Sequence, residues 1–446
     1  MNIKDKVFLI SLGCTKNLVD SENMLGLIKS KGFDLATSIE EARIAVVNTC
    51  AFIQAAVEET IDTILELVNL KAQGRLKKLV VVGCFVQRYG YKLQREMPEV
   101  DGWLGKGEIY RVADLIQNDN VNASVPFFID RPTYLADHCV PRVQTTYFFS
   151  SYLKIAEGCS HSCAYCIIPN LTGPFRSRSL ESLVIEAKKM AGLGVKEINL
   201  IAQDTTMYGK DLGGNVCLEE LLERLSTING LKWIRLLYCY PNGVSDRLLN
   251  LIESEEIICS YLDLPIQHVN EKILKAMRRN NSRETPFELI ERIRSLRRKI
   301  SIRTTLMVGF PGETEEIFDE LCYFVESAQV DHLGVFVFNG EKGTPAARFK
   351  SAVDKEMAEK RLDRIMNIQA DISRKTNQQM VGNIIPVLIE GVSSETDLLL
   401  NGRTETMAPD VDGQVLINKG EGVIGEIMPV LITEAHTYDL VGEIKA

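Results

Sequence analysis

The sequence lacks any long apolar run. No stretch of about 18 consecutive apolar residues occurs, so no membrane-spanning helix and no membrane partner are expected. The N-terminus, MNIKDKVFLISLGC, has a very short apolar stretch and no small-residue cleavage site, so no signal peptide is predicted. We therefore expect a cytoplasmic protein whose 11 cysteines stay reduced. In that compartment, unusual cysteine spacing indicates metal or redox chemistry.

The sequence also lacks an excess of positive charge. The formal net charge is −9, from 51 Lys and Arg against 60 Asp and Glu. A protein that binds nucleic acid through bulk electrostatics is usually basic, so this balance argues against that class. A phosphate-binding P-loop is missing too, because the glycine-rich GFPGET at 309–314 lacks the required Lys-Ser/Thr pair.

Strands and helices are expected to alternate from residue 1 to about 140. Three apolar strands there each end at a cysteine: KVFLISLGC at Cys14, ARIAVVNTC at Cys50 and KKLVVVGC at Cys84. Such βαβ units form parallel sheets, and side chains just past their strands gather along one rim. A single cysteine of this kind is usually a buried small hydrophobe. Three at equivalent places indicate a shared metal site instead.

Three more cysteines lie close together in EGCSHSCAYCIIP, at positions 159, 163 and 166. A closed zinc site takes four ligands, and Cys217 offers no second C-x-x-C pair. Thiolates are soft ligands for iron–sulfur clusters, zinc or copper(I). A cluster held by only three cysteines leaves one iron free to bind something else. His161 in the same loop is predicted to be an exposed loop residue rather than a ligand.

The rest of the chain divides into two further parts. Six more strands alternate with helices in residues 145–376, which predicts a partial (β/α)6 barrel with its site at the carboxyl ends of the strands. Short strands with Gly, Asp and Asn turns in 377–446 predict a small antiparallel β-barrel. The expected class is α/β, with domains at 1–140, 145–376 and 377–446. The basic stretch 275–299 is predicted to be a solvated helical face.

The spacing C-x-x-x-C-x-x-C, with Tyr165 just before the third cysteine, resembles that of radical S-adenosylmethionine (SAM) enzymes. Further stretches resemble the methylthiotransferase branch of that family over essentially the whole chain: SLGCTKNLVDSE, VVNTCAF, VVGC, QDTTMYG, LDLPIQH and TTLMVGFPGETEE. The C-terminal barrel resembles the TRAM domain of the same branch. Within it, GCTKN and GRTETMAPDVDG are most similar to the ribosomal-protein aspartate methylthiotransferases (RimO type). Thr15 departs from the residues usual at its position, but it offers no competing metal ligand.

The resemblance implies two 4Fe-4S clusters and SAM as cofactors. One cluster, with SAM on its open iron, would be held by Cys159, Cys163 and Cys166. The second would be held by Cys14, Cys50 and Cys84. The residues expected to contact SAM are Tyr165, Gln203, Asp204, Gln267 and Arg303. Each polar residue among these has an equal alternative as a satisfied group at the barrel rim, and no side chain is assigned as a catalytic acid or base.

The resemblance also implies the reaction and the partners. The substrate would be an aspartate β-carbon in the twelfth small-subunit ribosomal protein, free or within the ribosome, and flavodoxin or ferredoxin would donate electrons. The barrel at 377–446 carries 11 acidic and 3 basic residues, which should repel tRNA and attract a basic ribosomal protein. The alternatives are a tRNA adenosine methylthiotransferase and an iron–sulfur electron carrier. A carrier has no need of a barrel of some two hundred residues around one cluster.

Overall fold

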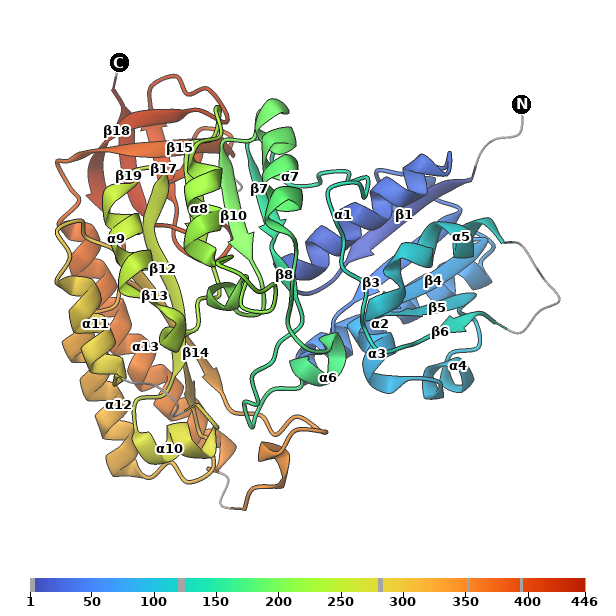
Figure 1. The fold of residues 1–446 in the computed structure, drawn as a ribbon, viewed down its shortest axis with the longest axis horizontal. Coiled ribbons are helices and arrows are strands. Elements are labelled where there is room, and N and C mark those ends of the chain that lie inside the picture. Colours follow the sequence, from blue (N-terminus) through green and yellow to red (C-terminus); the bar gives the residue numbers. More distant parts are fainter. Residues whose placement is uncertain (1–4, 119–124, 280–283, 351–352, 394–395, 446) are drawn as a thin grey trace.

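The protein has three parts that lie side by side (Figure 1). The computed structural model describes residues 5–118, 125–279, 284–350, 353–393 and 396–445. An N-terminal α/β part lies beside a larger α/β part in the middle of the chain, and a β-barrel at the C-terminal end packs against the larger part. Within the described ranges, no helix is both long enough and apolar enough to cross a membrane.

The N-terminal part contains a six-stranded sheet in the order β2-β1-β3-β4-β5-β6, in which every pair is parallel. Its strands are β1 (Lys6–Ser11), β2 (Asp34–Leu35), β3 (Ile44–Thr49), β4 (Lys78–Gly83), β5 (Gly102–Gly105) and β6 (Phe127–Phe128). Its helices are α1 (Thr15–Ser30), α2 (Gln54–Ala72), α3 (Cys84–Tyr89), α4 (Lys92–Glu96) and α5 (Val112–Gln117). The parallel α/β prediction for this region is confirmed.

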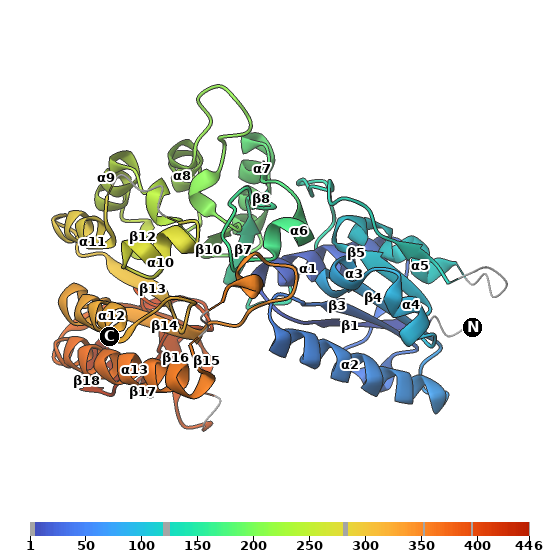
Figure 2. The same cartoon turned by 90° about the horizontal axis from the view of Figure 1, so that it is seen from below.

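Helices cover both faces of this sheet (Figure 2), with α1 and α5 on one face and α2 on the other. Strands β3 and β4 are therefore buried on both sides, which explains why their sequences are nearly continuous apolar runs. The helical region after β4 is divided into α3 and α4. The division falls at Gly90, whose φ of 62° lies in the left-handed region that glycine adopts without strain.

The central part is an open sheet of six parallel strands in the order β14-β13-β12-β11-β10-β7. The strands are β7 (Ser150–Lys154), β10 (Glu197–Ile201), β11 (Trp233–Leu236), β12 (Ile258–Gln267), β13 (Ser301–Val308) and β14 (His332–Val337). Its outer face is covered by α7 (Leu180–Gly192), α8 (Leu218–Ser226), α9 (Asp246–Ser254), α11 (Pro286–Arg294), α12 (Glu315–Ala328) and α13 (Lys355–Gln378). The expected partial (β/α)6 barrel is confirmed.

The C-terminal part is a closed barrel in the order β15-β16-β17-β19-β18. Its strands are β15 (Ile384–Val392), β16 (Leu400–Arg403), β17 (Val415–Lys419), β18 (Ile427–Ala435) and β19 (Leu440–Ile444). Four of the five pairings are antiparallel, as expected, but β17 and β19 pair in parallel. Strand β18 pairs with the edge of β15 opposite to β16. Strand β19 then pairs with β18 and closes the barrel by pairing with β17, to which it runs parallel.

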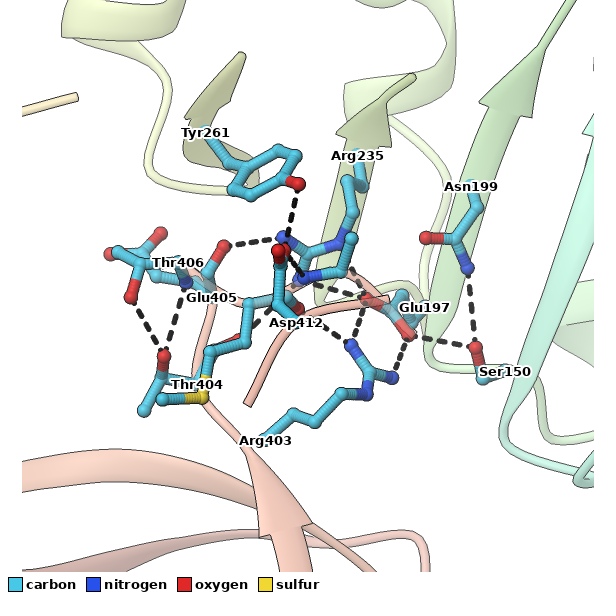
Figure 3. A network of polar contacts seen from close by, with 12 residues as sticks. Ser150, Glu197, Asn199, Arg235, Tyr261, Arg403, Thr404, Glu405, Thr406 and Asp412 are labelled. Atoms are coloured by element: carbon cyan, nitrogen blue, oxygen red, sulfur yellow. Dashed lines mark hydrogen bonds and ion pairs between the residues drawn. The ribbon is translucent and has the colours of Figure 1, made fainter. Parts of the chain in front are cut away.

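The barrel is attached to the central sheet through a buried carboxylate (Figure 3). Arg235 of β11 and Arg403 of β16 both bind Glu197 at the start of β10, with N–O distances of 3.0 and 2.6 Å. Burial alone would raise the pKa of Glu197, but the two guanidinium groups overcome it and lower the pKa from 4.5 to about 2. This stabilisation is present above pH 4.5 and is lost as the pH falls through about 2.

A carboxylate of the barrel, Asp412, makes a second attachment to the central sheet. Tyr261 of β12 donates its hydroxyl to Asp412 at 2.8 Å, and Arg303 of β13 forms an ion pair with the same group. The segment 404–412 therefore covers the end of the sheet at which the strands begin. The far end, where the strands finish, stays free to form a site.

We predict that Glu197→Gln lowers the free energy of unfolding by about 3 kcal/mol or more, because it leaves two buried arginines without their full counter-charge. Urea unfolding of the reconstituted protein, followed by circular dichroism, measures this loss. Glu426→Gln is the matched control at the same domain boundary. Glu426 pairs with Lys196 but is 54% exposed, so its loss should cost only about 0–1 kcal/mol. Equal effects of the two substitutions would contradict a structural role for Glu197.

Candidate metal and cofactor site

The three-cysteine loop follows β7 and is closed by a short ladder between β8 (Ala156–Glu157) and β9 (Arg176–Ser177). Gly158 starts the loop with a φ of 79°, and a Cβ there would lie 2.1 Å from the carbonyl oxygen of Pro174. Only glycine fits this close approach. The backbone of Cys159 donates to Gly173 and that of Ala164 donates to Met277, which fixes the loop above the ends of the strands.

Cys159, Cys163 and Cys166, called the loop triad below, line one cavity of about 180 Å³. Gln203 follows β10 and Gln267 ends β12, and both line the same cavity. The sequence order of the strands places these groups together, because side chains at the carboxyl ends of neighbouring parallel strands share one rim. The cavity therefore combines three soft ligands with neutral polar groups.

A partly buried cation lies against the loop triad. Arg279 donates to the sulfur of Cys163 at 3.6 Å, to the hydroxyl of Tyr165 at 3.3 Å and to the carbonyl of Pro265 at 2.6 Å. Its guanidinium also lies 4.3 Å from the ring centroid of Tyr240. Burial opposes the charge, but Tyr165 and Cys163 outweigh it and raise the pKa of Arg279. The cavity therefore holds a fixed positive charge beside the sulfur of Cys163.

Cys14, Cys50 and Cys84, the N-terminal triad, meet at the rim of the first sheet. Cys14 precedes α1, Cys50 directly follows β3, and Cys84 begins α3 directly after β4. A Cβ on Gly13 would lie 2.8 Å from the sulfur of Cys50, so the first two cysteines are close neighbours. Burial, with smaller contributions from the charges of Cys14 and Cys50, outweighs the opposing charge of Lys106 and raises the pKa of Cys84 to about 12. The convergence expected from the βαβ order is therefore present.

The cavity extends towards the N-terminal triad. Phe52, two residues after Cys50, and Tyr238 both line it. The hydroxyl of Tyr238 lies 3.3 Å from Oγ1 of Thr15, the residue after Cys14. A buried chain of charges also joins the two parts, since Asp20 of α1 binds Lys106 of its own part and Lys154 of β7. Lys154 also binds Glu157, two residues before the loop triad begins.

Comparisons with known proteins agree with this division. Residues 6–105 match Uncharacterized protein family UPF0004, residues 153–325 match the Radical SAM superfamily, and residues 381–444 match the TRAM domain. The chain is 47% identical over 443 residues to the ribosomal protein uS12 methylthiotransferase RimO of Geotalea uraniireducens, with 99% of each chain covered. The RimO protein of Geobacter sulfurreducens is also 47% identical, with the same coverage. The chain belongs to the RimO family of radical SAM methylthiotransferases.

Solved structures agree on the fold alone. The radical SAM methyltransferase TsrM from Kitasatospora setae, with cobalamin and a [4Fe-4S] cluster bound, gives a TM-score of 0.57 at 15% identity over 85% of this chain and 79% of its own. The cobalamin-dependent radical SAM enzyme OxsB gives a TM-score of 0.51 at 11% identity, over 82% of this chain and 56% of its own. Both likenesses support the radical SAM architecture of this RimO-family chain.

The cofactors of the RimO family are SAM and iron–sulfur clusters, two of them by the family norm. The donor set of this chain fits them. Burial, with smaller contributions from the charges of neighbouring cysteines, raises the pKa of Cys159 to about 11 and that of Cys166 to about 12. Such thiols ionise when metal supplies the counter-charge. Among the described residues, no three Cys, His, Asp or Glu side chains lie close enough to bind one shared ion. This agrees with a cubane cluster, because each thiolate of a cubane binds a different iron.

Two of the polar residues expected at SAM line the cavity, and one lies behind it. Gln203 and Gln267 join Tyr165 on its wall. Asp204 is almost fully buried, and its carboxylate lies 2.6 Å from Nε2 of His161. His161 itself lines the cavity and stacks on Tyr240 with ring centroids 4.1 Å apart. The expectation of an exposed loop histidine was therefore wrong, because Asp204 and Tyr240 hold the ring against the site.

Arg303 does not line the cavity. Its guanidinium pairs with Asp412 and donates to the carbonyl of Val411 at 3.2 Å, on the side where the C-terminal barrel attaches. The residue lies near the start of β13, whereas the cavity lies beyond the ends of the strands. Arg303 and the cavity therefore lie at opposite ends of the sheet. The sequence motif does not indicate at which end of β13 the side chain of Arg303 lies.

Sequence reasoning missed Arg279 and Tyr238. Arg279 belongs to the basic stretch 275–299, which was interpreted as a solvated face, yet it is partly buried and its guanidinium lies against the loop triad. The neighbouring Arg278 has a φ of 58°, which ends helix α10 (Glu271–Ala276) and turns the chain inward. Tyr238 also has a positive φ, 59°, directly after β11. Neither of these left-handed positions is occupied by glycine, so the residue types there do not predict a turn.

We predict that the reconstituted protein contains about eight irons, about four for each triad. Replacing all three cysteines of either triad with alanine should leave about four, because each cluster then loses every protein ligand. Chemical iron analysis together with the absorption spectrum measures this.

Replacing Cys217, Cys259 and Cys322 is the matched control and should leave the iron content unchanged. A variant of the N-terminal triad that keeps the full iron load would show that those cysteines are not ligands.

Proposed function

We propose that this chain methylthiolates the β-carbon of an aspartate in ribosomal protein uS12. The observation that carries the proposal is a cavity that the loop triad lines and that Phe52, two residues after Cys50, also lines, in a chain that is 47% identical over its full length to enzymes named for this reaction. A single cluster would serve an electron carrier. A second set of three cysteines next to this cavity suits a reaction that needs a radical and a sulfur atom at the same carbon.

The cofactors supply the demanding chemistry. When bound, the loop-triad cluster and SAM supply the radical that removes hydrogen from an unactivated carbon, while the second cluster and a second SAM supply the sulfur and the methyl group. Cys159, Cys163 and Cys166 hold the first cluster, and Cys14, Cys50 and Cys84 hold the second.

The remaining side chains bind, orient and exclude water. Gln203 and Gln267 offer amide donors and acceptors to the polar end of SAM. Arg279 fixes Cys163 and Tyr165 through its two donors. The rings of Tyr238 and Tyr240 form walls of the cavity, and a radical needs such a dry enclosure to avoid side reactions. Asp204 acts through His161, whose ring it orients.

The proposal includes the partners. A small reduced carrier such as flavodoxin or ferredoxin supplies electrons, and the enzyme works in the cytoplasm, where ribosomal proteins are made and assembled. The substrate is uS12, free or within the small subunit. A tRNA substrate is disfavoured because the C-terminal barrel has 11 acidic and 3 basic residues.

We predict that reduced, reconstituted enzyme with SAM adds one methylthio group to purified uS12, and that mass spectrometry of peptides locates it on an aspartate. The same enzyme should leave bulk tRNA unmodified by nucleoside analysis. The loop-triad alanine variant is the control and should modify neither. Methylthioadenosine in tRNA, together with unmodified uS12, would overturn the proposal in favour of the tRNA alternative.

Only some acids of the barrel are available to attract a basic substrate. Glu405 pairs with Arg298, and Asp412 is enclosed by Arg303 and Tyr261. Glu390 pairs with Arg403, itself one of the three basic residues. These groups attach the barrel to the enzyme or stabilise it. The acids that remain exposed include Asp397, Glu421 and Glu434, and we assign the attraction of uS12 to this set.

We predict that reversing Asp397, Glu421 and Glu434 to lysine weakens uS12 binding and flattens its dependence on salt, because long-range attraction is lost. Fluorescence anisotropy with labelled uS12 at several salt concentrations measures both effects. The matched control reverses Glu58, Asp62 and Glu66 on helix α2, which changes the net charge by the same amount on another domain. Equal losses in both triple variants would mean that net charge alone, and not the barrel, guides uS12.

A further inference from the structure

Lys16 is a buried lysine without an ion pair, and its charge acts on Asp263 only at longer range. The described part of the chain has three buried lysines, and two of them, Lys106 and Lys154, share Asp20. Lys16 is 7% exposed, yet no carboxylate lies within 4.0 Å of its ammonium and no acceptor takes its hydrogen bonds among the described residues. A largely buried ammonium with no ion pair gains stability when an anion joins it.

The one contact of the ammonium is with a wall of the cavity. Nζ of Lys16 lies 3.2 Å from the ring centroid of Tyr238, and Tyr238 lines the cavity beside the loop triad. A cation–π contact is worth about 0.5–2 kcal/mol, which offsets only part of the cost of burial. The backbone N–H of Tyr238 donates to Asp263 at 2.9 Å, which holds the ring in place.

The surroundings of Lys16 favour a negative group further. Lys16 is the second residue of α1, a helix of 16 residues with no acidic residue in its first turn and no side-chain cap. The free N–H groups and the dipole at such a helix start attract anions. Arg279, the other cation of the cavity, already has three acceptors, so it is less available to a new ligand.

We propose that Lys16, together with the first turn of α1, binds the β-carboxylate of the substrate aspartate. The inference rests on the proposed function and extends it to a specificity-determining residue. That carboxylate is one bond from the carbon that reacts, so holding it beside Tyr238 places the carbon at the cavity that the loop triad lines. A site with an unpaired cation also rejects asparagine, which has the same shape but no charge.

The test is a double-mutant cycle between Lys16 and the target residue. Reduced, reconstituted wild-type enzyme and Lys16→Gln are each titrated by calorimetry with uS12 and with uS12 whose target aspartate is changed to asparagine. Wild type should bind the aspartate form about tenfold more tightly or better, as expected for a lost charge-assisted hydrogen bond. In Lys16→Gln this preference should vanish, and in Lys16→Arg a part of it should return. Lys29→Met, at the exposed end of the same helix, is the matched control and should keep the wild-type preference.

The alternative role for Lys16 is to balance the charge of the N-terminal cluster. That role predicts a changed paramagnetic resonance spectrum of this cluster in Lys16→Gln and an equal loss of affinity for both uS12 forms, an outcome that overturns the inference. A wild-type enzyme that modifies the aspartate of uS12 but binds both forms equally also overturns it, while the proposed function stands. A wild-type enzyme that leaves uS12 unmodified overturns both.

Discussion

The carboxylate of Asp20 holds the two halves of the site together. It lies on α1 and binds Lys106 from the first sheet and Lys154 from the second, with all three groups buried. Burial would raise the pKa of Asp20, but the two ammonium groups outweigh it and lower the pKa. A shift of one part against the other would leave a buried charge unpaired, which costs several kcal/mol. This constraint fixes the position of the N-terminal triad relative to the loop triad.

Glu197 does the same work at the other boundary. It joins Arg235 of the central sheet to Arg403 of the barrel (Figure 3). In the same way, Asp20 joins lysines from two parts of the chain. Each boundary therefore depends on one acidic group shared between two cations. The barrel closes the end of the sheet where strands begin, and the first domain faces the end where strands finish. The reactive cavity lies between the first domain and the strand ends, away from the barrel.

Some acidic residues of the barrel therefore attach it to the central sheet and are not available to bind a substrate. The excess of acids was expected to face a basic substrate, yet Asp412 and Glu405 face arginines of the central sheet. The motif GRTETMAPDVDG, which resembles the RimO type, contains both of these residues and Arg403. Its polar groups are thus explained by attachment of the barrel. Attraction of uS12 is left to acids elsewhere on the barrel surface.

Local sequence patterns predicted the six cysteines as candidate metal ligands, the order of strands and helices, and the three parts of the chain. A cysteine after a β-strand and the spacing C-x-x-x-C-x-x-C are short-range patterns, and parallel strand order brings such residues to one rim. Only the tertiary structure decided which polar groups face the cavity. Arg279 and Tyr238 line it because of left-handed turns, and Lys16 contacts Tyr238 across the boundary between domains. Arg303 is directed away from it by its position near the start of β13. Those positions depend on packing between segments far apart in sequence, which no local pattern records.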